Sequence, residues 1–200
     1  MANDWPAWSR LIHGPTDWPA VLEEMHDHPE LDATRGLVQS PQWHPEGDVL
    51  THLGLAALAA ARHADRDGLV GADREVAVLG ALVHDLGKPL TTRREPDGRI
   101  TSHGHAEKGV DPARRLLERI GAPREVVRRI LPVVREHMAP ASVTGRPSRH
   151  AVLRLQRRLE DAGSSLADWA RVVDADRAGR GGTPRPSPAE QWLAIAREPR

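Results

Sequence analysis

An adjacent His–Asp pair gives the first chemical signal in the sequence. His84 and Asp85 stand at the end of an apolar run, Leu82 to Leu86, where a purely structural core has little use for two hard ligands. Other histidines and carboxylates fall near the ends of further predicted helices: His52, His105, His137, Asp174 and Asp176. Facing helices of a bundle can bring such side chains together in its core. We therefore predict a metal site there.

The ligand types limit which metals this site can hold. The chain has no cysteine, so disulfides, thiolate zinc sites, iron–sulfur clusters and cysteine nucleophiles are excluded. Four imidazoles and two carboxylates are enough ligands for two ions with Asp85 as a bridge, and such a set suits Mn, Fe, Co, Ni or Zn. We therefore expect divalent transition-metal ions, two in number.

Length and composition favour one helical domain. The 200 residues carry 28 basic and 28 acidic side chains, so no overall charge favours nucleic acid or membrane. Six Trp residues stand without any Phe or Tyr, and we expect all six in the core. No apolar run approaches the ~20 residues of a membrane helix, and Met1 to Trp8 do not resemble a secretion signal. We expect a cytoplasmic protein with no membrane contact.

Apolar residues recur at helical spacing along most of the chain. The predicted helices cover about 20–26, 48–63, 73–86, 105–120, 124–138, 149–161, 165–178 and 190–197. The polar stretch 91–104, with its Asp97-Gly98 turn, predicts a loop or a small hairpin. The fold class is therefore all-α, a helical bundle with a metal site in its core. We expect an N-terminal helical or irregular cap (1–40), a main domain (41–180), and a Gly/Pro-rich linker with a short C-terminal helix (181–200).

Ordered sequence blocks within residues 41–180 resemble the HD-domain superfamily of metal-dependent phosphohydrolases, whose signature is a His, a His–Asp pair and a late Asp. The blocks are His44-Pro45-Glu46-Gly47-Asp48-Val49 before His52, Val83 to Pro89, Gly104-His105-Ala106-Glu107, and Asp176-Arg177-Ala178-Gly179-Arg180. They look like the HD domain of bacterial, CCA-adding tRNA nucleotidyltransferases. They also look like the HD phosphatase module that RNA-end-healing enzymes fuse to a polynucleotide kinase.

This resemblance implies roles for individual residues. The metal-binding set becomes His52, His84, Asp85 and Asp176, with His105 and His137 as the extra histidines of two-metal members. The Asp-x-x-Gly-Arg spacing selects Asp176 over Asp174, while His103 could take the place of His105. Asp85 and Lys88 are the expected catalytic residues. Lys88, one of only two lysines, matches the family's phosphate-facing lysine.

Further basic residues are expected to hold the substrate. Besides Lys88, these are Arg93, Arg94 and Arg180. Arginines on the helices, such as Arg114 and Arg128, alternate with acidic residues and are typical of a solvated face. His44 either supports the metal ligands or caps the Trp43 segment.

The resemblance implies hydrolysis of phosphate esters by a metal-activated hydroxide. The expected reaction removes a 2′-phosphate or opens a 2′,3′-cyclic phosphate of nucleotides or RNA 3′ ends, with a separately encoded RNA kinase or ligase as a possible partner. The chain has no Gly-x-x-x-x-Gly-Lys loop and no nucleotidyltransferase domain ahead of the HD region, so neither kinase activity nor nucleotide addition is expected of it.

Three alternatives stay open at this point. Some HD-fold proteins use the same six ligands in a mixed-valent diiron oxygenase, and others are catalytically silent regulatory modules. A phosphohydrolase acting on other nucleotide esters, such as a dNTP triphosphohydrolase or a cyclic-nucleotide phosphodiesterase, belongs to the same chemical class as the leading hypothesis.

Overall fold

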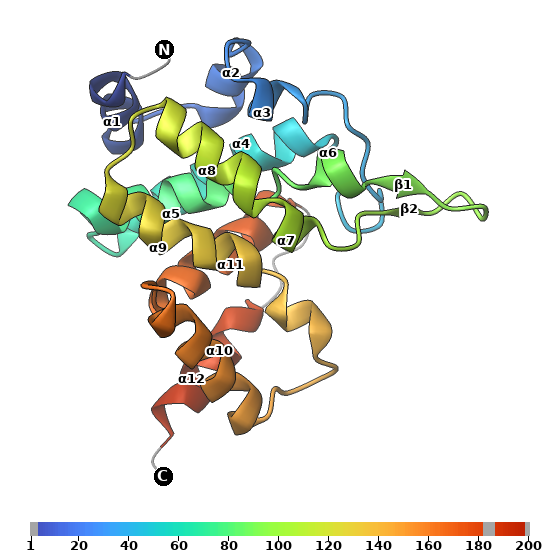
Figure 1. Cartoon of the computed structure of the whole chain (residues 1–200), viewed down its shortest axis with the longest axis vertical. Coiled ribbons are helices and arrows are strands. Elements are labelled where there is room, and N and C mark those ends of the chain that lie inside the picture. The colour runs from blue at the N-terminus through green and yellow to red at the C-terminus, as the bar shows by residue number, and fades with distance from the viewer. Residues whose placement is uncertain (1–3, 182–186, 199–200) are drawn as a thin grey trace.

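The fold is a helical bundle with one small hairpin, as a computed structural model of residues 4–181 and 187–198 shows (Figure 1). This confirms the predicted all-α class. The first half contains α1 (Trp5–His13), α2 (Trp18–Glu23), α3 (Pro29–Asp32), α4 (Val49–Arg66), α5 (Gly71–Val83), α6 (Lys88–Thr91), β1 (Arg93–Arg94) and β2 (Ile100–Thr101). The second half contains α7 (His105–Lys108), α8 (Val110–Arg119), α9 (Arg124–Glu136), the 3-10 helix η1 (Ala139–Ser142), α10 (Arg149–Asp161), α11 (Leu166–Gly179) and α12 (Pro188–Arg197).

Helices α4, α5 and α11 form the centre of the bundle, and α4 packs along both of the others. Asp48 starts α4 because its carboxylate accepts a hydrogen bond from the backbone N–H of Thr51 at 2.9 Å. In α5, every residue from Val76 to Val83 is buried. Ligands carried by these helices are therefore held in the interior on rigid elements.

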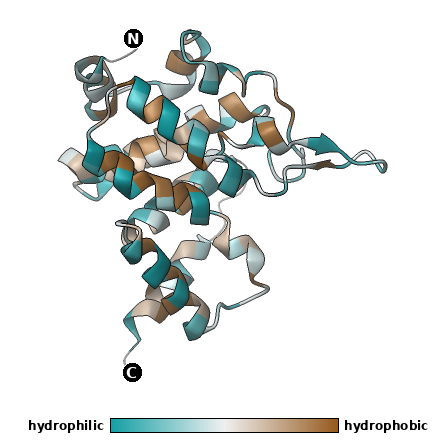
Figure 2. Cartoon of the chain, viewed as in Figure 1, coloured by the Kyte–Doolittle hydropathy of each residue, from teal (hydrophilic) through white to brown (hydrophobic). Residues whose placement is uncertain are grey.

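The apolar interior has two parts, and Figure 2 shows hydrophobic and hydrophilic segments alternating along the helices that enclose it. The larger part joins residues of α1 to α5, α8, α9 and α11, with Leu53, Leu79 and Leu116 fully buried. The smaller part lies among α9 to α12, where the rings of Trp169 and Trp192 are 5.4 Å apart. Among residues 4–181 and 187–198, no helix has the length and apolar character needed to cross a membrane.

The N-terminal forty residues are more regular than the sequence suggested. Helix α1 was not predicted, although Asp4 caps it by accepting from the N–H of Ala7 at 3.0 Å and Pro6 stands in its first turn. Trp8 and Trp18 are fully buried, with ring centres 6.2 Å apart. Burial of these two large rings makes α1 and α2 part of the main core.

Other differences concern the ends of helices. The predicted helix at 105–120 is divided into α7 and α8 at Gly109, a residue that packs closely against Gly87. The predicted helix at 73–86 ends at Val83, so that His84 and Asp85 lie in the turn that follows it. Most of the predicted linker, residues 182–186, lies outside the described part of the chain.

The stretch 91–104 was predicted to be a loop or a small hairpin, and it contains a small hairpin. Arg93 pairs with Thr101, and Arg94 pairs with Ile100, in antiparallel register. Figure 1 shows this hairpin projecting from the side of the bundle. It begins just after α6, so it stands next to the His–Asp turn.

Candidate metal centre

The structure brings all six predicted metal ligands into one buried cluster. They come from α4, the turn after α5, the start of α7, the end of α9 and α11: His52, His84, Asp85, His105, His137 and Asp176. Each of these residues is less than a tenth exposed. Side chains far apart in the sequence therefore meet in the interior of the bundle.

One half of the cluster joins His52, His84 and the carboxylates of Asp85 and Asp176. The Nε2 atom of His52 lies 3.3 Å from Nε2 of His84 and 3.1 Å from Oδ1 of Asp176. Oδ2 of Asp85 lies 3.3 Å from Nε2 of His84. Two atoms bound to one metal ion at about 2.1 Å must lie within roughly 4.2 Å of each other, and these atoms do.

The other half of the cluster joins His105 and His137 to the second oxygen of the same carboxylate. Oδ1 of Asp85 lies 3.1 Å from Nε2 of His105 and 3.6 Å from Nε2 of His137. The two Nε2 atoms are 3.1 Å apart. Asp85 thus presents one oxygen to each half, which is the arrangement of a bridging ligand.

The histidine rings are oriented by backbone carbonyls. Each of three rings has its Nδ1 atom close to the carbonyl oxygen three residues earlier: His84 at 2.8 Å from Ala81, His105 at 2.7 Å from Ser102, and His137 at 2.7 Å from Val134. A carbonyl oxygen only accepts, so each Nδ1 carries the hydrogen and donates it. With Nδ1 engaged in this way, each ring turns its Nε2 atom to the centre of the cluster, where the neutral form would offer a lone pair to a metal ion.

The centre of this cluster fits divalent cations. Nε2 lone pairs face one another and face carboxylate oxygens, and Oδ1 of Asp85 is buried without a hydrogen-bond donor. A buried carboxylate oxygen that has no donor is costly unless a cation compensates it. The imidazole and carboxylate donors are those that Mn, Fe, Co, Ni and Zn accept.

The charges of neighbouring groups keep the carboxylates ionised. Burial alone would raise the pKa of Asp85, but Lys88 and His84 outweigh it and hold that pKa well below its usual range. Burial likewise opposes ionisation of Asp176, yet His52 and Arg180 lower its pKa strongly. For His137, burial lowers the pKa and favours the neutral ring, which is the form that binds a metal.

The structure separates two pairs of candidates that lie close in the sequence. Asp176 faces His52, whereas Asp174 accepts a hydrogen bond from the hydroxyl of Ser187, because residues two apart on a helix point in different directions. His105 faces Asp85, whereas His103 is exposed. Asp176 and His105 are therefore the members that the fold brings to the cluster.

Comparison with known proteins identifies the family of the chain that carries this cluster. The HD-domain profile matches residues 49–176, which begin at the first residue of α4 and end at Asp176. The chain belongs to the HD-domain family. The predicted resemblance to metal-dependent phosphohydrolases of this superfamily is confirmed.

Several similar proteins carry the name Multifunctional CCA protein, which confirms the likeness to CCA-adding enzymes. The one from Halorhodospira halophila (strain DSM 244 / SL1) is 39% identical over 173 residues, covering 85% of this chain and 39% of that protein. The one from Xanthomonas campestris pv. campestris (strain B100) is 32% identical over 186 residues, covering 87% and 42%. The chain thus spans about two fifths of the length of these curated relatives.

Two positively charged side chains, Lys88 and Arg180, lie beside the six predicted metal ligands. Nζ of Lys88 lies 2.6 Å from Oδ2 of Asp85 and donates to Oε1 of Gln39 at 2.5 Å. Arg180 donates through Nη2 to Oδ2 of Asp176 at 2.7 Å. Both cations line a cavity of about 650 Å³, together with Asp85 and Asp176. The cavity therefore has a strongly charged inner end.

The other two predicted substrate residues do not reach this cavity. Arg93 and Arg94 are exposed on β1 and do not line it. Their hairpin partners Ile100 and Thr101, on β2, line it instead. The second strand of the hairpin thus faces the cavity, whereas its two arginines do not line it. The sequence of a charged loop does not indicate which strand will face a cavity.

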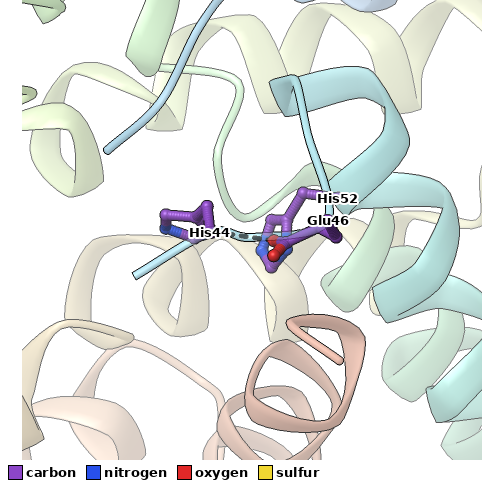
Figure 3. Close-up of side chains that lie close together, drawn as sticks. All are labelled: His44, Glu46 and His52. Atoms are coloured by element: carbon purple, nitrogen blue, oxygen red, sulfur yellow. Dashed lines mark hydrogen bonds and ion pairs between the residues drawn. The ribbon is translucent and has the colours of Figure 1, made fainter. Parts of the chain in front are cut away.

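Sequence reasoning assigned no role to Glu46, which connects His44 and His52 (Figure 3). Its Oε1 lies 2.8 Å from Nδ1 of His44 and 2.7 Å from Nδ1 of His52. Burial would raise the pKa of Glu46, but the two histidines and a backbone hydrogen bond lower it to about 2. An ionised Glu46 orients His52 from behind, as the carbonyls orient the other rings. Its position two residues after His44 was the available signal.

Proposed function

We propose that this HD domain is a metal-dependent phosphohydrolase that removes a 2′-phosphate or opens a 2′,3′-cyclic phosphate of nucleotides or RNA ends. The observation that carries the proposal is the position of Lys88. Its ammonium lies 2.6 Å from the carboxylate shared by both halves of the cluster, and it lines the cavity. A compact cation at that point suits an anionic substrate.

Each charged group at the inner end of the cavity has a role in this reaction. Two divalent ions, when bound by the six ligands, lower the pKa of a water molecule and neutralise charge on phosphoryl oxygens. Lys88 stabilises the charge that develops on the phosphate during the reaction. Arg180 is held by Asp176 at the same cavity and offers its remaining N–H groups to a phosphate oxygen.

The class of substrate rests on the relatives and on the cations. The relatives carry "CCA" in their names, and the resemblance to HD domains of tRNA nucleotidyltransferases supports a nucleotide or RNA end as substrate. Lys88 beside the shared carboxylate supports phosphate hydrolysis, because an ammonium group can stabilise the charge that develops on a phosphoryl group. RNA ends freed of phosphate would then suit a separately encoded RNA kinase or ligase.

A panel of adenosine phosphates tests the proposal. Protein stripped with a chelator is restored with Mn, Ni, Co or Mg and offered 2′-AMP, 3′-AMP, 5′-AMP and 2′,3′-cyclic AMP, and released phosphate or opened ester is measured. We expect metal-dependent turnover that prefers 2′-AMP and the cyclic ester. Absence of turnover with every metal would contradict the proposal, and oxygen consumption by the iron-loaded protein would then test the oxygenase alternative.

The Lys88→Met variant is expected to lose about a hundredfold in hydrolytic rate, the size of effect seen when one preorganised hydrogen-bond donor is removed. Methionine keeps much of the length of the side chain but cannot stabilise a phosphate. Bound metal should remain, since no predicted ligand is changed. Turnover and metal content are measured together.

The other lysine of the chain gives a matched control. Lys108 is exposed on α7, and Lys108→Met removes the same charge away from the cavity. We expect it to hydrolyse 2′-AMP at the wild-type rate. An equal loss in both variants would argue for a general charge effect and against a specific role of Lys88.

A further inference from the structure

We propose that Trp43 is the platform on which the base of a nucleoside phosphate stacks while its phosphate lies at Lys88. The inference rests on the proposed function and names a recognition site for the nucleoside part of the substrate. This platform would complement Lys88 and Arg180, whose charges suit only the phosphate part of the substrate.

Trp43 differs from every other aromatic residue of the chain in its exposure. The chain has six Trp and no Phe or Tyr, and all six Trp lie in the described ranges. Trp8, Trp18 and Trp169 are fully buried, Trp192 is 4% exposed, and Trp5 packs partly buried against the core. Trp43 is 53% exposed, contrary to the expectation that all six stabilise the core. Its large apolar ring is thus available to a ligand.

The exposed ring stands at the cavity that is also lined by predicted metal ligands. Trp43 lines this cavity together with Lys88 and Asp85. Its neighbour His44 has Nε2 at 3.3 Å from Nζ of Lys88. The backbone N–H of Trp43 donates to the carbonyl of Ser40 at 3.0 Å, which fixes the turn that carries the indole. The ring is therefore one residue from a side chain that touches the proposed phosphate-binding cation.

The polarity of the cavity matches that of a nucleotide. Its inner end is charged, through Asp85, Lys88 and Arg180, whereas Trp43 and the 38% exposed Met138 add apolar surface to the lining. A nucleotide has the same two parts, an anionic phosphate and a flat base with an apolar face. A volume of about 650 Å³ is within the usual range for small-molecule sites. Stacking tolerates any base, so we expect recognition of a base without strict choice among bases.

Binding measurements test the platform independently of turnover. The tryptophan fluorescence of the metal-restored protein is followed during titration with adenosine, 2′-AMP or inorganic phosphate, excited where adenine does not absorb. We expect adenosine and 2′-AMP to quench the fluorescence and phosphate not to do so. The quenching should disappear in Trp43→Ala and persist in Trp5→Phe, which alters a ring outside the cavity.

Affinity gives the second readout. We expect Trp43→Ala to raise the Kd for 2′-AMP about tenfold, which is about 1.4 kcal/mol and within the range for one stacked base. The Kd for inorganic phosphate should change several-fold less. Leu153→Ala, which truncates an exposed apolar side chain on α10, should leave both values unchanged. Thermal melting checks that all variants are folded.

The outcomes separate the platform from the proposed function. Equal weakening of 2′-AMP and phosphate by Trp43→Ala would overturn the platform, as would hydrolysis of 2′-AMP whose KM does not depend on Trp43. Quenching by adenosine that depends on Trp43 would support the platform even if no adenosine phosphate were hydrolysed, in which case the proposed function alone would fail.

Discussion

The Asp85→Asn variant is expected to lose its bound divalent metal and about a thousandfold or more of its hydrolytic rate, since metal ions supply several kcal/mol to phosphoryl transfer and each 1.36 kcal/mol is tenfold. Asp85 presents one carboxylate oxygen to each half of the cluster, Oδ2 to His84 and Oδ1 to His105. Asparagine preserves the shape but removes the negative charge and replaces one accepting oxygen with a donating NH2 group.

The loss of charge should matter more here than at a surface. Asp85 is 2% exposed and its pKa is held well below the usual range by Lys88 and His84, despite burial. Without the carboxylate, Lys88 loses the anion that lies 2.6 Å from its ammonium, and the centre of the cluster loses the negative charge that would attract a cation. Metal binding and turnover should therefore fail together.

Metal content after dialysis and turnover of 2′,3′-cyclic AMP measure the two effects. Asp174→Asn is the matched control, because it makes the same change on α11 at a carboxylate that contacts Ser187 and lies outside the cluster. We expect the control to keep both metal and turnover. Retention of full metal content by Asp85→Asn would show that this carboxylate is not the bridge.

The sequence predicted the elements whose pattern is local. Apolar spacing placed α4, α9, α10 and α11 within a few residues, because burying one face of a helix leaves a periodic trace. The choice of Asp176 over Asp174 came from a short motif, and the helix geometry agrees with it, since only one of the two can face His52.

The parts that sequence reasoning missed depend on contacts between distant segments. Gln39 reaches Lys88 across 49 positions, and no local pattern relates the two. The loop arginines Arg93 and Arg94 were assigned to the substrate because of their charge, but the direction of a hairpin is set by what it packs against. Similarly, composition placed Trp43 in the core, and only the fold shows that its turn lies at a cavity.

The Gly87→Ala variant is expected to damage the second half of the cluster without touching a ligand. A Cβ atom at Gly87 would overlap the carbonyl oxygen of His105 and come within 2.5 Å of the backbone N of Gly109. Both obstacles are backbone, so they cannot rotate away. We expect a destabilisation of about 3 kcal/mol, which corresponds to a fall in Tm of about 6–12 °C for a chain of this size.

The functional effect should be larger than the change in stability alone explains. Relief of the clash must move His105, whose Nε2 lies 3.1 Å from Oδ1 of Asp85, while His52 and His84 are carried by other elements. We expect the metal content to fall from two ions toward one and turnover to fall about a hundredfold, as for a displacement of about 1 Å in a catalytic group.

Variants at two further glycines distinguish a general loss of stability from specific damage to the metal-ligand cluster. In Gly109→Ala the new Cβ would lie 2.9 Å from the same oxygen of His105, so a smaller effect of the same kind is expected. In Gly80→Ala it would meet only the side chain of Val172, between α5 and α11, so Tm should fall while the metal content is kept. If Gly80→Ala lost metal as readily as Gly87→Ala, general loosening of the bundle would explain both. If it does not, the close contact of Gly87 with the start of α7 is what holds His105 against Asp85.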